Sequence, residues 1–226
     1  LHLSRAGPAY PDTYLMGDVA DPAPMGRERG ATVHLEPEGV VESFPLPEGQ
    51  RRWVVHTGLG ARVEPSPALL ASMVRARTGT VLDPRAFSMI SAFSVRRRSA
   101  RRLLSRRCVV IGDAAHEISP IGGQGMTLAW LDALDLAPLL VRSRGHGKAG
   151  DLRSLRGWLG VERRVQRRAR VAGTLAAVNT VLGRPAPAAV SVMRSVLVAC
   201  ALRTPLRRVM AWAYSMDFLS AFLNFL

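Results

Sequence analysis

The sequence has little cysteine, and it lacks the pattern of a secretion signal. Two cysteines among 226 residues cannot build the disulfide framework of a secreted domain, and they favour a reducing compartment. The first residues show no basic stretch followed by a continuous apolar core, so no export is expected. We therefore expect a cytoplasmic protein.

Long uncharged apolar runs are also missing. The two longest apolar stretches, residues 190–202 and 209–226, are interrupted or bounded by Arg194, Arg203 and Asp217. Each falls short of the roughly 20 uncharged residues that a membrane-spanning helix needs. We expect at most a peripheral membrane contact.

Acidic residues are few, since 17 Asp and Glu face 31 Lys and Arg, for a formal charge of +14. A basic chain of this kind suits nucleic acid, anionic lipid or an acidic substrate, but it also fits a solvated basic surface. The arginines cluster at Arg96, Arg97, Arg98, Arg101, Arg102, Arg106 and Arg107, and again at Arg163, Arg164, Arg167, Arg168 and Arg170. The clusters are not interleaved with aromatic side chains and no nucleic-acid-binding motif is present, so no nucleic-acid partner is expected.

The first part of the chain predicts an antiparallel sheet. Residues 31–58 contain three extended runs, separated by Pro- and Gly-containing segments at 36–39 and 47–50 that are typical of reverse turns. Ser66 and Pro67 then predict the start of a short helix laid on this sheet. Gly79 predicts its end, and residues 87–95 return as a strand.

The later part has an α/β pattern with long apolar helices. The apolar run Cys108-Val109-Val110-Ile111-Gly112 predicts a parallel strand that is covered on both faces. A helix is expected to begin near Met126, and Pro138 should kink or end it. Asp151 predicts the start of a long helix, and two further apolar helices should follow residues 183–188.

That long helix carries two kinds of side chain at helical spacing. One face has an apolar stripe made of Leu152, Leu155, Leu159, Val165, Ala169 and Ala172. The arginines at 163–170 are predicted to lie on the opposite face, exposed to solvent.

Between the strand and the first long helix lies a segment that predicts a ligand site. Gly112 and Asp113 come at the carboxyl end of the strand, which is where open α/β sheets bind ligands. Gly122, Gly123 and Gly125 remove side chains, and the helix that follows points free N–H groups at the same place. An anion or an electron-rich ring would be held there. The alternative is that Asp113 caps a turn that the glycines merely shape.

This segment closely resembles the second flavin-binding motif of the FAD-dependent aromatic hydroxylases, the class with the para-hydroxybenzoate hydroxylase fold. The residues that carry the resemblance are Gly112-Asp113-Ala114-Ala115-His116, Pro120, Gly122-Gly123-Gln124-Gly125-Met126 and Asp132-Ala133. The resemblance implies an α/β protein in which part of a flavin-binding Rossmann-like domain accompanies an antiparallel-sheet substrate domain and C-terminal helices. The implied ranges are 1–104 for the substrate domain, 105–178 for the FAD-binding part and 179–226 for the helices.

The resemblance also implies how FAD is held. Asp113 would accept hydrogen bonds from the ribityl hydroxyls, Pro120 would lie beside the isoalloxazine where oxygen reacts, and the amides near Gly125 and Met126 would face the pyrimidine edge. The complete set of cofactor-binding candidates is Gly112, Asp113, Ala114, Pro120, Gly122, Gly123, Gln124, Gly125, Met126 and Thr127, with Pro120 as the catalytic candidate and no metal ligand. His116 would lie near the pyrophosphate or serve the structure, and Asp132 is expected to be a packed helix residue. Thr127 stands where the family often has Asn.

Two other motifs of the family are missing. No Gly-x-Gly-x-x-Gly segment follows an N-terminal strand, and no Asp-Gly segment precedes the predicted substrate domain. The chain therefore resembles the C-terminal half or more of a hydroxylase, and alone it is expected to be inactive and to bind FAD poorly. An N-terminal half is the partner that this interpretation requires.

The resemblance implies a monooxygenase that uses FAD, with NAD(P)H as reductant, on an aromatic, quinone-like or polyketide-like substrate. The alternatives are a flavin-dependent reductase of the same superfamily, or a non-catalytic module that binds a partner through its basic helices. His34, His56 and Arg51 lie on the sheet that should face the substrate, but each is expected to be a solvent-side residue.

Overall fold

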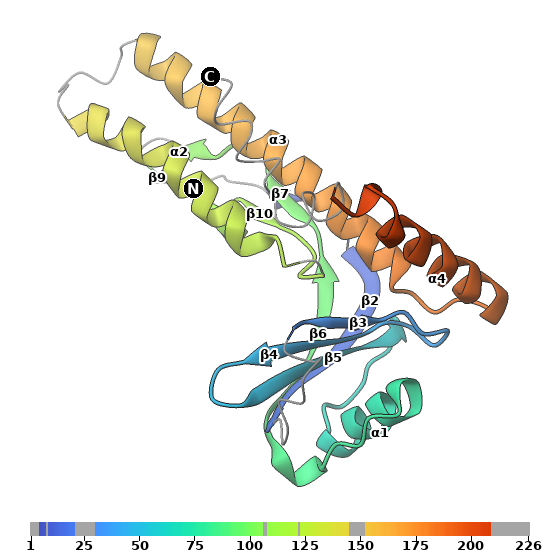
Figure 1. Cartoon of the computed structure of the whole chain (residues 1–226). Coiled ribbons are helices and arrows are strands. Elements are labelled where there is room, and N and C mark those ends of the chain that lie inside the picture. Colours follow the sequence, from blue (N-terminus) through green and yellow to red (C-terminus); the bar gives the residue numbers. More distant parts are fainter. Residues whose placement is uncertain are drawn as a thin grey trace. The chain divides into compact units, whose positions relative to one another are not determined.

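The computed structural model describes residues 5–7, 9–20, 30–105, 108–121, 123–144 and 152–208. The chain forms two compact units (Figure 1). The sheet unit consists of residues 11–95 and 180–204, and the motif unit consists of residues 1–10, 96–179 and 205–226. The domain roles predicted for 1–104, 105–178 and 179–226 stay predictions.

The sheet unit is built on a five-stranded sheet in the order β3-β4-β5-β2-β6. Its strands are β2 (Ala9–Ala20), β3 (Thr32–His34), β4 (Val41–Leu46), β5 (Gln50–Leu59) and β6 (Phe87–Arg96). Strands β3, β4, β5 and β2 pair antiparallel, which confirms the predicted meander. Both predicted turns form, with the Gly39 amide donating to the Glu36 carbonyl at 3.0 Å and Gln50 to Pro47 at 3.4 Å.

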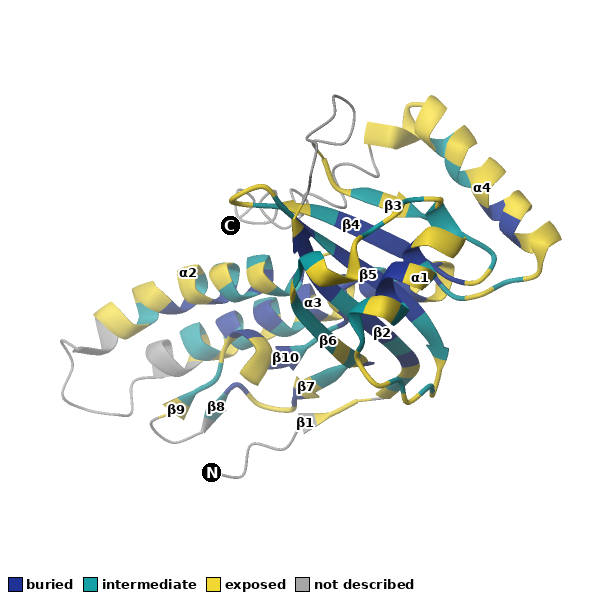
Figure 2. Ribbon diagram, turned by 90° about the horizontal axis from the view of Figure 1, so that it is seen from below, coloured by how far each residue is buried: buried dark blue, intermediate teal, exposed yellow. Residues whose placement is uncertain are grey.

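Helix α1 (Pro67–Thr78) covers one face of this sheet, as the sequence predicts. Gly79 ends it in the left-handed conformation, with φ at 75°, and donates its N–H to the Arg75 carbonyl. The helix buries Leu70 and Val74 against the sheet. Their partners in the core are Leu15, Val19, Val41, Trp53 and Val55, and Figure 2 shows this burial on β4 and β5 in dark blue.

Helix α4 (Ala188–Arg203) belongs to the sheet unit as well. Arg194, which interrupts its apolar run, is buried and donates to the carbonyls of Leu182, Arg184 and Glu36 at 2.5, 3.2 and 3.1 Å. This arginine therefore ties the helix to the turn before it and to the β3–β4 connection. The second predicted C-terminal helix, over residues 209–226, lies outside the described residues.

The motif unit contains the long helices α2 (Gly125–Arg144) and α3 (Leu152–Leu182, within this unit as far as residue 179). A three-stranded antiparallel sheet accompanies them, in the order β1 (Arg5–Ala6), β7 (Arg98–Ala100) and β10 (His116–Glu117). No helix in the described part of the chain is long and apolar enough to cross a membrane.

The predicted parallel strand over residues 108–112 is wrong. Only Cys108–Val109 form a strand, β9, and it pairs antiparallel with β8 (Leu104–Ser105) just before it in the chain. Cys108 is exposed rather than covered. An apolar run of this length predicts extended backbone, but its periodicity does not identify the neighbour with which it pairs.

The sequence predicts that Pro138 kinks or ends helix α2. The helix does not end there but continues to Arg144, and a kink at Pro138 stays a prediction. Pro138 and Leu134, whose carbonyl loses its helical partner, both lie on the exposed side, where water can satisfy that carbonyl.

On α3 the predicted stripe is confirmed at Val165, Ala169 and Ala172, which are buried, whereas Leu159 is 41% exposed. Arg168 is not on a solvent face: it is buried and forms an ion pair with Asp135 of α2. The carboxylate that pairs with it compensates the cost of burying the guanidinium. The predicted cap Asp151 and the side chains of Leu152 and Leu155 lie outside the described residues.

Candidate flavin site

The segment from residue 111 to residue 127 begins with a turn that favours glycine. Gly112 opens a short 3-10 helix, η2 (Gly112–Ala114), with φ at 57°. A Cβ atom at Gly112 would lie 3.1 Å from the Cβ of Ala129 on α2. The left-handed backbone and the close approach of α2 therefore both favour glycine at this position.

Asp113 follows on the exposed side of the turn. Its Oδ1 atom lies 3.8 Å from the position that a Cβ would take at Gly125, the first residue of α2. A carboxylate near the positive end of a helix is stabilised by the helix dipole. The turn therefore presents Asp113 beside the start of α2, and the hydroxyls of a ligand at this place would find an acceptor.

The connection to α2 alternates buried and exposed residues. Ser119 is buried, and its Oγ accepts a hydrogen bond from the Ile121 amide at 3.3 Å. The Gly123 amide donates to the Pro120 carbonyl at 2.9 Å, which closes a turn that leaves both Pro120 and Gly123 exposed. Gly122 lies outside the described residues. The buried side chains anchor the loop, and Pro120 is held on its outer side.

Helix α2 begins at Gly125, one residue before Met126, near which the sequence predicts its start. The first amides of any helix have no partner within it, so they are available to a ligand. Gln124, which precedes the helix, is buried, and its carbonyl accepts from the Leu128 amide at 3.1 Å. Met126 is 73% exposed, and Thr127 is half-buried.

The predicted cofactor-binding residues that the structure describes lie on one loop and on the first turn of α2. They fall into three classes by how far each is exposed to solvent. Asp113, Ala114, Pro120, Gly123 and Met126 are exposed, Gly125 and Thr127 are half-buried, and Gly112 and Gln124 are buried. The buried pair shapes the loop, so direct contact with a ligand falls to the exposed and half-buried residues.

The described part of the chain leaves open space beside two glycines of this loop, as a bound FAD would require. A Cβ at Gly123 would meet no atom of the described chain within 4 Å, and one at Gly125 would meet only ordinary contacts at 3.8 and 4.0 Å. Contacts within the chain therefore leave room for a side chain at Gly125, whose φ is not positive. At Gly123 the left-handed backbone, with φ at 67°, already accounts for glycine, whereas at Gly125 a bound group lying against the backbone would account for it.

His116 and Asp132 support the loop from the inside. Asp132 of α2 is fully buried, and its Oδ2 accepts from the Gly112 amide at 3.1 Å and contacts the His116 Nε2 at 2.5 Å. The expectation that Asp132 is a packed helix residue is confirmed. His116 also supports the structure, because its contact with Asp132 joins β10 to α2.

The sheet unit holds a second polar cluster, around Asp12. Asp12 is fully buried and accepts two hydrogen bonds from Arg184, at 2.9 and 2.8 Å, and its Oδ1 lies 3.1 Å from Nε2 of His56. Burial alone would raise the pKa of Asp12, but the hydrogen bonds from Arg184 and His56 outweigh it and lower the pKa below the usual value. The cluster thus holds a buried carboxylate in its charged form.

Two residues predicted to face solvent are buried in this unit instead. His56 is fully buried and meets the ring of Tyr14 edge-on, with centroids 5.1 Å apart. Burial lowers the pKa of His56, against the opposing effect of Asp12. Arg51 is buried and donates to Ser43 at 3.2 Å. His34, the third of these residues, is half-buried.

Glu42 of β4 is a buried titratable residue that the sequence did not suggest. Its side chain is buried, and burial raises its pKa from 4.5 to about 7. Tyr14 lies close enough for the two groups to interact, and burial followed by the charges of Asp12 and Glu42 raises the pKa of Tyr14. A single Glu among strand residues gives no sign of burial, so only the structure identifies it.

Comparison with known proteins decides the family. The model of the FAD binding domain family matches residues 14–155, which is more than half of the chain. The chain belongs to this FAD binding domain family. The match includes the loop described above, and it confirms the resemblance to the FAD-dependent aromatic hydroxylases.

The curated relatives that match this chain are named as a monooxygenase and a hydroxylase. A 6-methylpretetramide 4-monooxygenase from Streptomyces rimosus is 35% identical over 143 residues, covering 60% of this chain and 25% of that protein. A 3-demethoxyubiquinol 3-hydroxylase from Escherichia coli (strain K12) is 40% identical over 58 residues, covering 26% of this chain and 15% of that protein. The chain thus spans a quarter or less of the length of these relatives.

Solved structures share the fold over nearly the whole chain. The Diels-Alderase PyrE3 of pyrroindomycin biosynthesis gives a TM-score of 0.74 at 21% identity, covering 94% of this chain and 45% of that one. CabE, an aromatic hydroxylase from angucycline biosynthesis, gives 0.72 at 20% identity, covering 95% and 43%. The fold class predicted from the sequence is confirmed.

The first flavin motif has no counterpart in the described part of the chain. The letters Gly145-His146-Gly147-Lys148-Ala149-Gly150 match the spacing of Gly-x-Gly-x-x-Gly, but they follow α2 and not a strand. The motif needs a strand before it and a helix N-terminus after it to bring its amides to a pyrophosphate. This match lies outside the described residues and carries no argument for a dinucleotide site.

Proposed function

We propose that this chain is part of a flavin-dependent monooxygenase that hydroxylates or epoxidises an aromatic, quinone-like or polycyclic substrate. The observation that supports the proposal is the loop around Gly112 and Gly125, which exposes Asp113, Pro120 and Met126 and where a Cβ at Gly123 would meet no described atom within 4 Å. The relatives named as a monooxygenase and a hydroxylase support the reaction class. A cytoplasmic location and NAD(P)H as reductant belong to the same proposal.

The residues of the loop would divide the work of holding FAD. Asp113 would accept hydrogen bonds from ribityl hydroxyls, because it is the exposed carboxylate at the turn. The amides at the start of α2 would face the pyrimidine edge, where the positive end of the helix stabilises the negative charge of the reduced ring. Pro120, exposed and fixed by the Gly123 amide, would border the reacting side. FAD supplies the redox chemistry when bound, and these residues orient it.

The cofactor half of the proposal is tested by flavin titration. The chain alone should bind FAD weakly and be colourless, since no Gly-x-Gly-x-x-Gly segment follows a strand in the described part of the chain to hold the ADP half. A yellow preparation with one FAD per chain would contradict the interpretation that an N-terminal half is needed. In a complex or longer form that binds FAD, Asp113→Ala should cost about 1–3 kcal/mol of binding, because buried hydroxyls lose an acceptor.

A matched control variant makes this titration specific. Glu64→Ala removes an exposed carboxylate in the sheet unit, so it should leave the affinity for FAD unchanged. Equal losses for Asp113→Ala and Glu64→Ala would contradict the role given to Asp113. The readout is the quenching of flavin fluorescence as protein is added.

The reaction class is tested by oxygen consumption in the form that binds FAD. A monooxygenase consumes one O₂ and one NAD(P)H for each hydroxylated product when reduction and product formation are tightly coupled. A flavin-dependent reductase would consume NAD(P)H without incorporating oxygen into the product. Incubation under ¹⁸O₂ with mass analysis of the product distinguishes the two, and a product without the label would overturn the proposed reaction.

A further inference from the structure

Helix α4 buries its polar side chains and exposes apolar ones. Its buried residues are Ser191 and Arg194. Val196 lies two positions beyond Arg194, which is about 200° around the helix, and it is 54% exposed. The exposed residues on this side of the helix, which we call the α4 stripe, are Ala189, Val192, Met193, Val196, Ala199 and Cys200. Figure 2 shows α4 in yellow, the colour of exposed residues, over most of its length.

Polar contacts, rather than the α4 stripe, attach this helix to the sheet unit. Arg194 donates to the carbonyls of Leu182, Arg184 and Glu36, and to Oγ of Ser191 at 3.2 Å. These contacts hold the helix and leave the α4 stripe exposed. A continuous apolar surface that a fold leaves exposed marks a contact with another protein or with a membrane.

The charges near the α4 stripe are all basic. Arg203, the last residue of α4, is exposed seven positions after Val196 and therefore lies on the same side of the helix. Arg207 and Arg208 follow within five residues and are exposed as well. The sequence contains no Asp or Glu between positions 163 and 216. Basic side chains beside an apolar stripe are complementary to an anionic lipid surface, because the arginines meet headgroups where the apolar side chains enter the acyl boundary.

The length of α4 suits a helix that lies on a membrane. Its 16 residues are fewer than the roughly 20 that a helix needs to cross the hydrocarbon core. A helix in the plane of the interface inserts one side only, and its other side faces away from the lipid. In α4 that other side carries Ser191 and Arg194, which the sheet unit covers.

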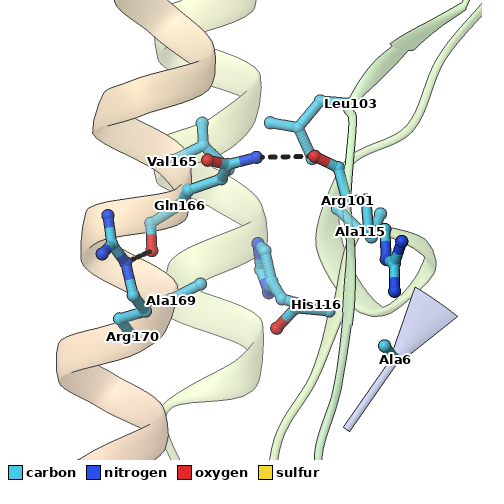
Figure 3. A pocket seen from close by; sticks show the side chains of 11 residues that line it. Ala6, Arg101, Leu103, Ala115, His116, Val165, Gln166, Ala169 and Arg170 are labelled. Carbon is cyan, nitrogen blue, oxygen red and sulfur yellow. Dashed lines mark hydrogen bonds between the residues drawn. The ribbon is translucent and has the colours of Figure 1, made fainter.

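The basic helix α3 does not offer a surface of this kind. Its Ala169 is buried and points toward His116 of β10, and Gln166 donates to the Arg101 carbonyl at 3.2 Å (Figure 3). The exposed residues of α3 between positions 163 and 174 are Arg163, Arg167, Arg170, Val171 and Thr174. This side can attract an anionic surface, but it has little apolar surface to insert into one.

We propose that α4 docks the chain on an anionic lipid bilayer. The helix lies parallel to the membrane plane, with Val192, Met193 and Val196 in the acyl boundary and Arg203 among the phosphate headgroups. The α4 stripe belongs to the sheet unit and the flavin loop to the motif unit. The docking surface does not rest on the proposed function.

The two cysteines of the chain provide a test with a built-in control. Both are exposed, but Cys200 belongs to the α4 stripe, whereas Cys108 lies on β9 of the motif unit. A nitrobenzoxadiazole maleimide is attached to Cys200 in a Cys108→Ser chain, and to Cys108 in a Cys200→Ser chain. Vesicles of phosphatidylglycerol and phosphatidylcholine in equal parts are then added at about 0.15 M salt. The label on Cys200 should brighten and shift its emission to shorter wavelength because it leaves water, and the label on Cys108 should not change.

Substitutions measured by sedimentation with the same vesicles locate the contact. Val192→Glu should weaken binding at least about tenfold, which corresponds to about 1.4 kcal/mol, because it removes an inserted side chain and adds a negative charge. The control is Val141→Glu, the same change on α2, where the side chain is 72% exposed. It should bind like the parent chain. Arg203→Gln should weaken binding about fivefold, and it should have no effect on the weaker binding to vesicles of phosphatidylcholine alone.

The proposal is overturned if the chain does not sediment with the anionic vesicles, or if the label on Cys108 responds as strongly as the label on Cys200. It is also overturned if Val141→Glu weakens binding as much as Val192→Glu while both variants keep the circular dichroism of the parent chain. A dimer that Val192→Glu dissociates, in a chain that does not bind vesicles, would assign the α4 stripe to a second copy instead. None of these measurements contains FAD, so their failure and the failure of the proposed monooxygenase function are distinguishable.

Discussion

His116 is held to Asp132 by a contact of 2.5 Å between Nε2 and Oδ2, and both side chains are buried. The same carboxylate oxygen accepts from the Gly112 amide. Three segments, the η2 turn, β10 and α2, therefore meet at one oxygen atom. The pair fixes the turn that displays Asp113, so its main role is to position the loop.

Removing this carboxylate should destabilise the motif unit. Asp132→Ala leaves the Gly112 amide and the His116 ring without their acceptor, and each buried unsatisfied group costs about 1–3 kcal/mol. Urea unfolding of the purified chain measures the change. The control is Ala133→Ser at the next position, which is exposed and should have little effect. Equal stability of Asp132→Ala and the parent chain would show that the contact between His116 and Asp132 does not stabilise the fold.

The sequence allowed the loop to be predicted because its information is local. Gly112, Asp113 and the glycines up to Gly125 lie within a short segment whose spacing is specific, and the start of α2 follows from them. The antiparallel pairing of Cys108 with Ser105 could not be predicted in the same way. An apolar run is compatible with either strand direction, and the choice depends on which backbone groups are free to pair.

Two glycines of the loop, Gly112 and Gly123, should respond differently to alanine. Gly112→Ala meets both a left-handed backbone, which costs about 1–2 kcal/mol for other residues, and the Cβ of Ala129 at 3.1 Å. Gly123→Ala has the same kind of backbone, with φ at 67°, but no atom nearby, so it should cost less than Gly112→Ala. Thermal unfolding of the two variants gives the comparison.

Gly125→Ala should separate stability from cofactor binding. Its φ is not positive and its nearest contact is 3.8 Å, so the free energy of unfolding should stay equal or rise by up to about 1 kcal/mol, as for Gly→Ala in helices. In the form that binds FAD, the added methyl group should weaken binding, because it enters the space proposed for the ring. A variant that is less stable yet binds FAD normally would contradict both expectations.

The sheet unit shows why the burial of polar residues escaped prediction. Asp12 is paired with Arg184, which lies 172 positions away in the chain. Whether His56 is buried depends on that pair and on Tyr14, and no local pattern records such long-range contacts. The alternation of β5 places His56 on one face of the sheet, but it does not say whether that face is covered.

Glu42 should make the stability of the sheet unit depend on pH. Its pKa rises from 4.5 to about 7 because it is buried, so between these values the folded state keeps a proton that the unfolded state has lost. The free energy of unfolding should therefore fall as the pH rises from about 4.5 to about 7, by an amount on the order of 1–3 kcal/mol. Below pH 4.5 this contribution is fully present.

Glu42→Gln carries a side chain that stays neutral, so it should remove the fall in the free energy of unfolding that the rising pH causes in the parent chain. Relative to the parent chain, the variant should gain stability between pH 5 and pH 8 in urea unfolding, while Glu64→Gln, an exposed control, should follow the parent at both values. Asp12 acts in the opposite sense, since its lowered pKa gives stability that is lost only in acid. A pH-independent difference between Glu42→Gln and the parent chain would show that Glu42 does not titrate in this range.

The arginines of α3 should bind nucleic acid only weakly, because part of their charge is already paired. Arg168 is buried against Asp135, and Arg164 lies 3.5 Å from the same carboxylate. The exposed Arg163, Arg167 and Arg170 supply charge, and no aromatic residue lies between positions 163 and 170 of the sequence, so binding should be independent of sequence. On duplex DNA the affinity should fall with salt at a log–log slope near −0.9 per phosphate contacted.

Titrating the chain with duplex DNA and with single-stranded DNA across a salt series measures this. We expect binding to vanish near 0.15 M salt, where charges are screened beyond about 8 Å. Arg163→Glu combined with Arg167→Glu should abolish the low-salt binding, whereas Arg75→Glu, on α1 of the sheet unit, should have a smaller effect. Sub-micromolar binding to either of the two at about 0.15 M salt would favour a basic interaction module over the proposed oxygenase.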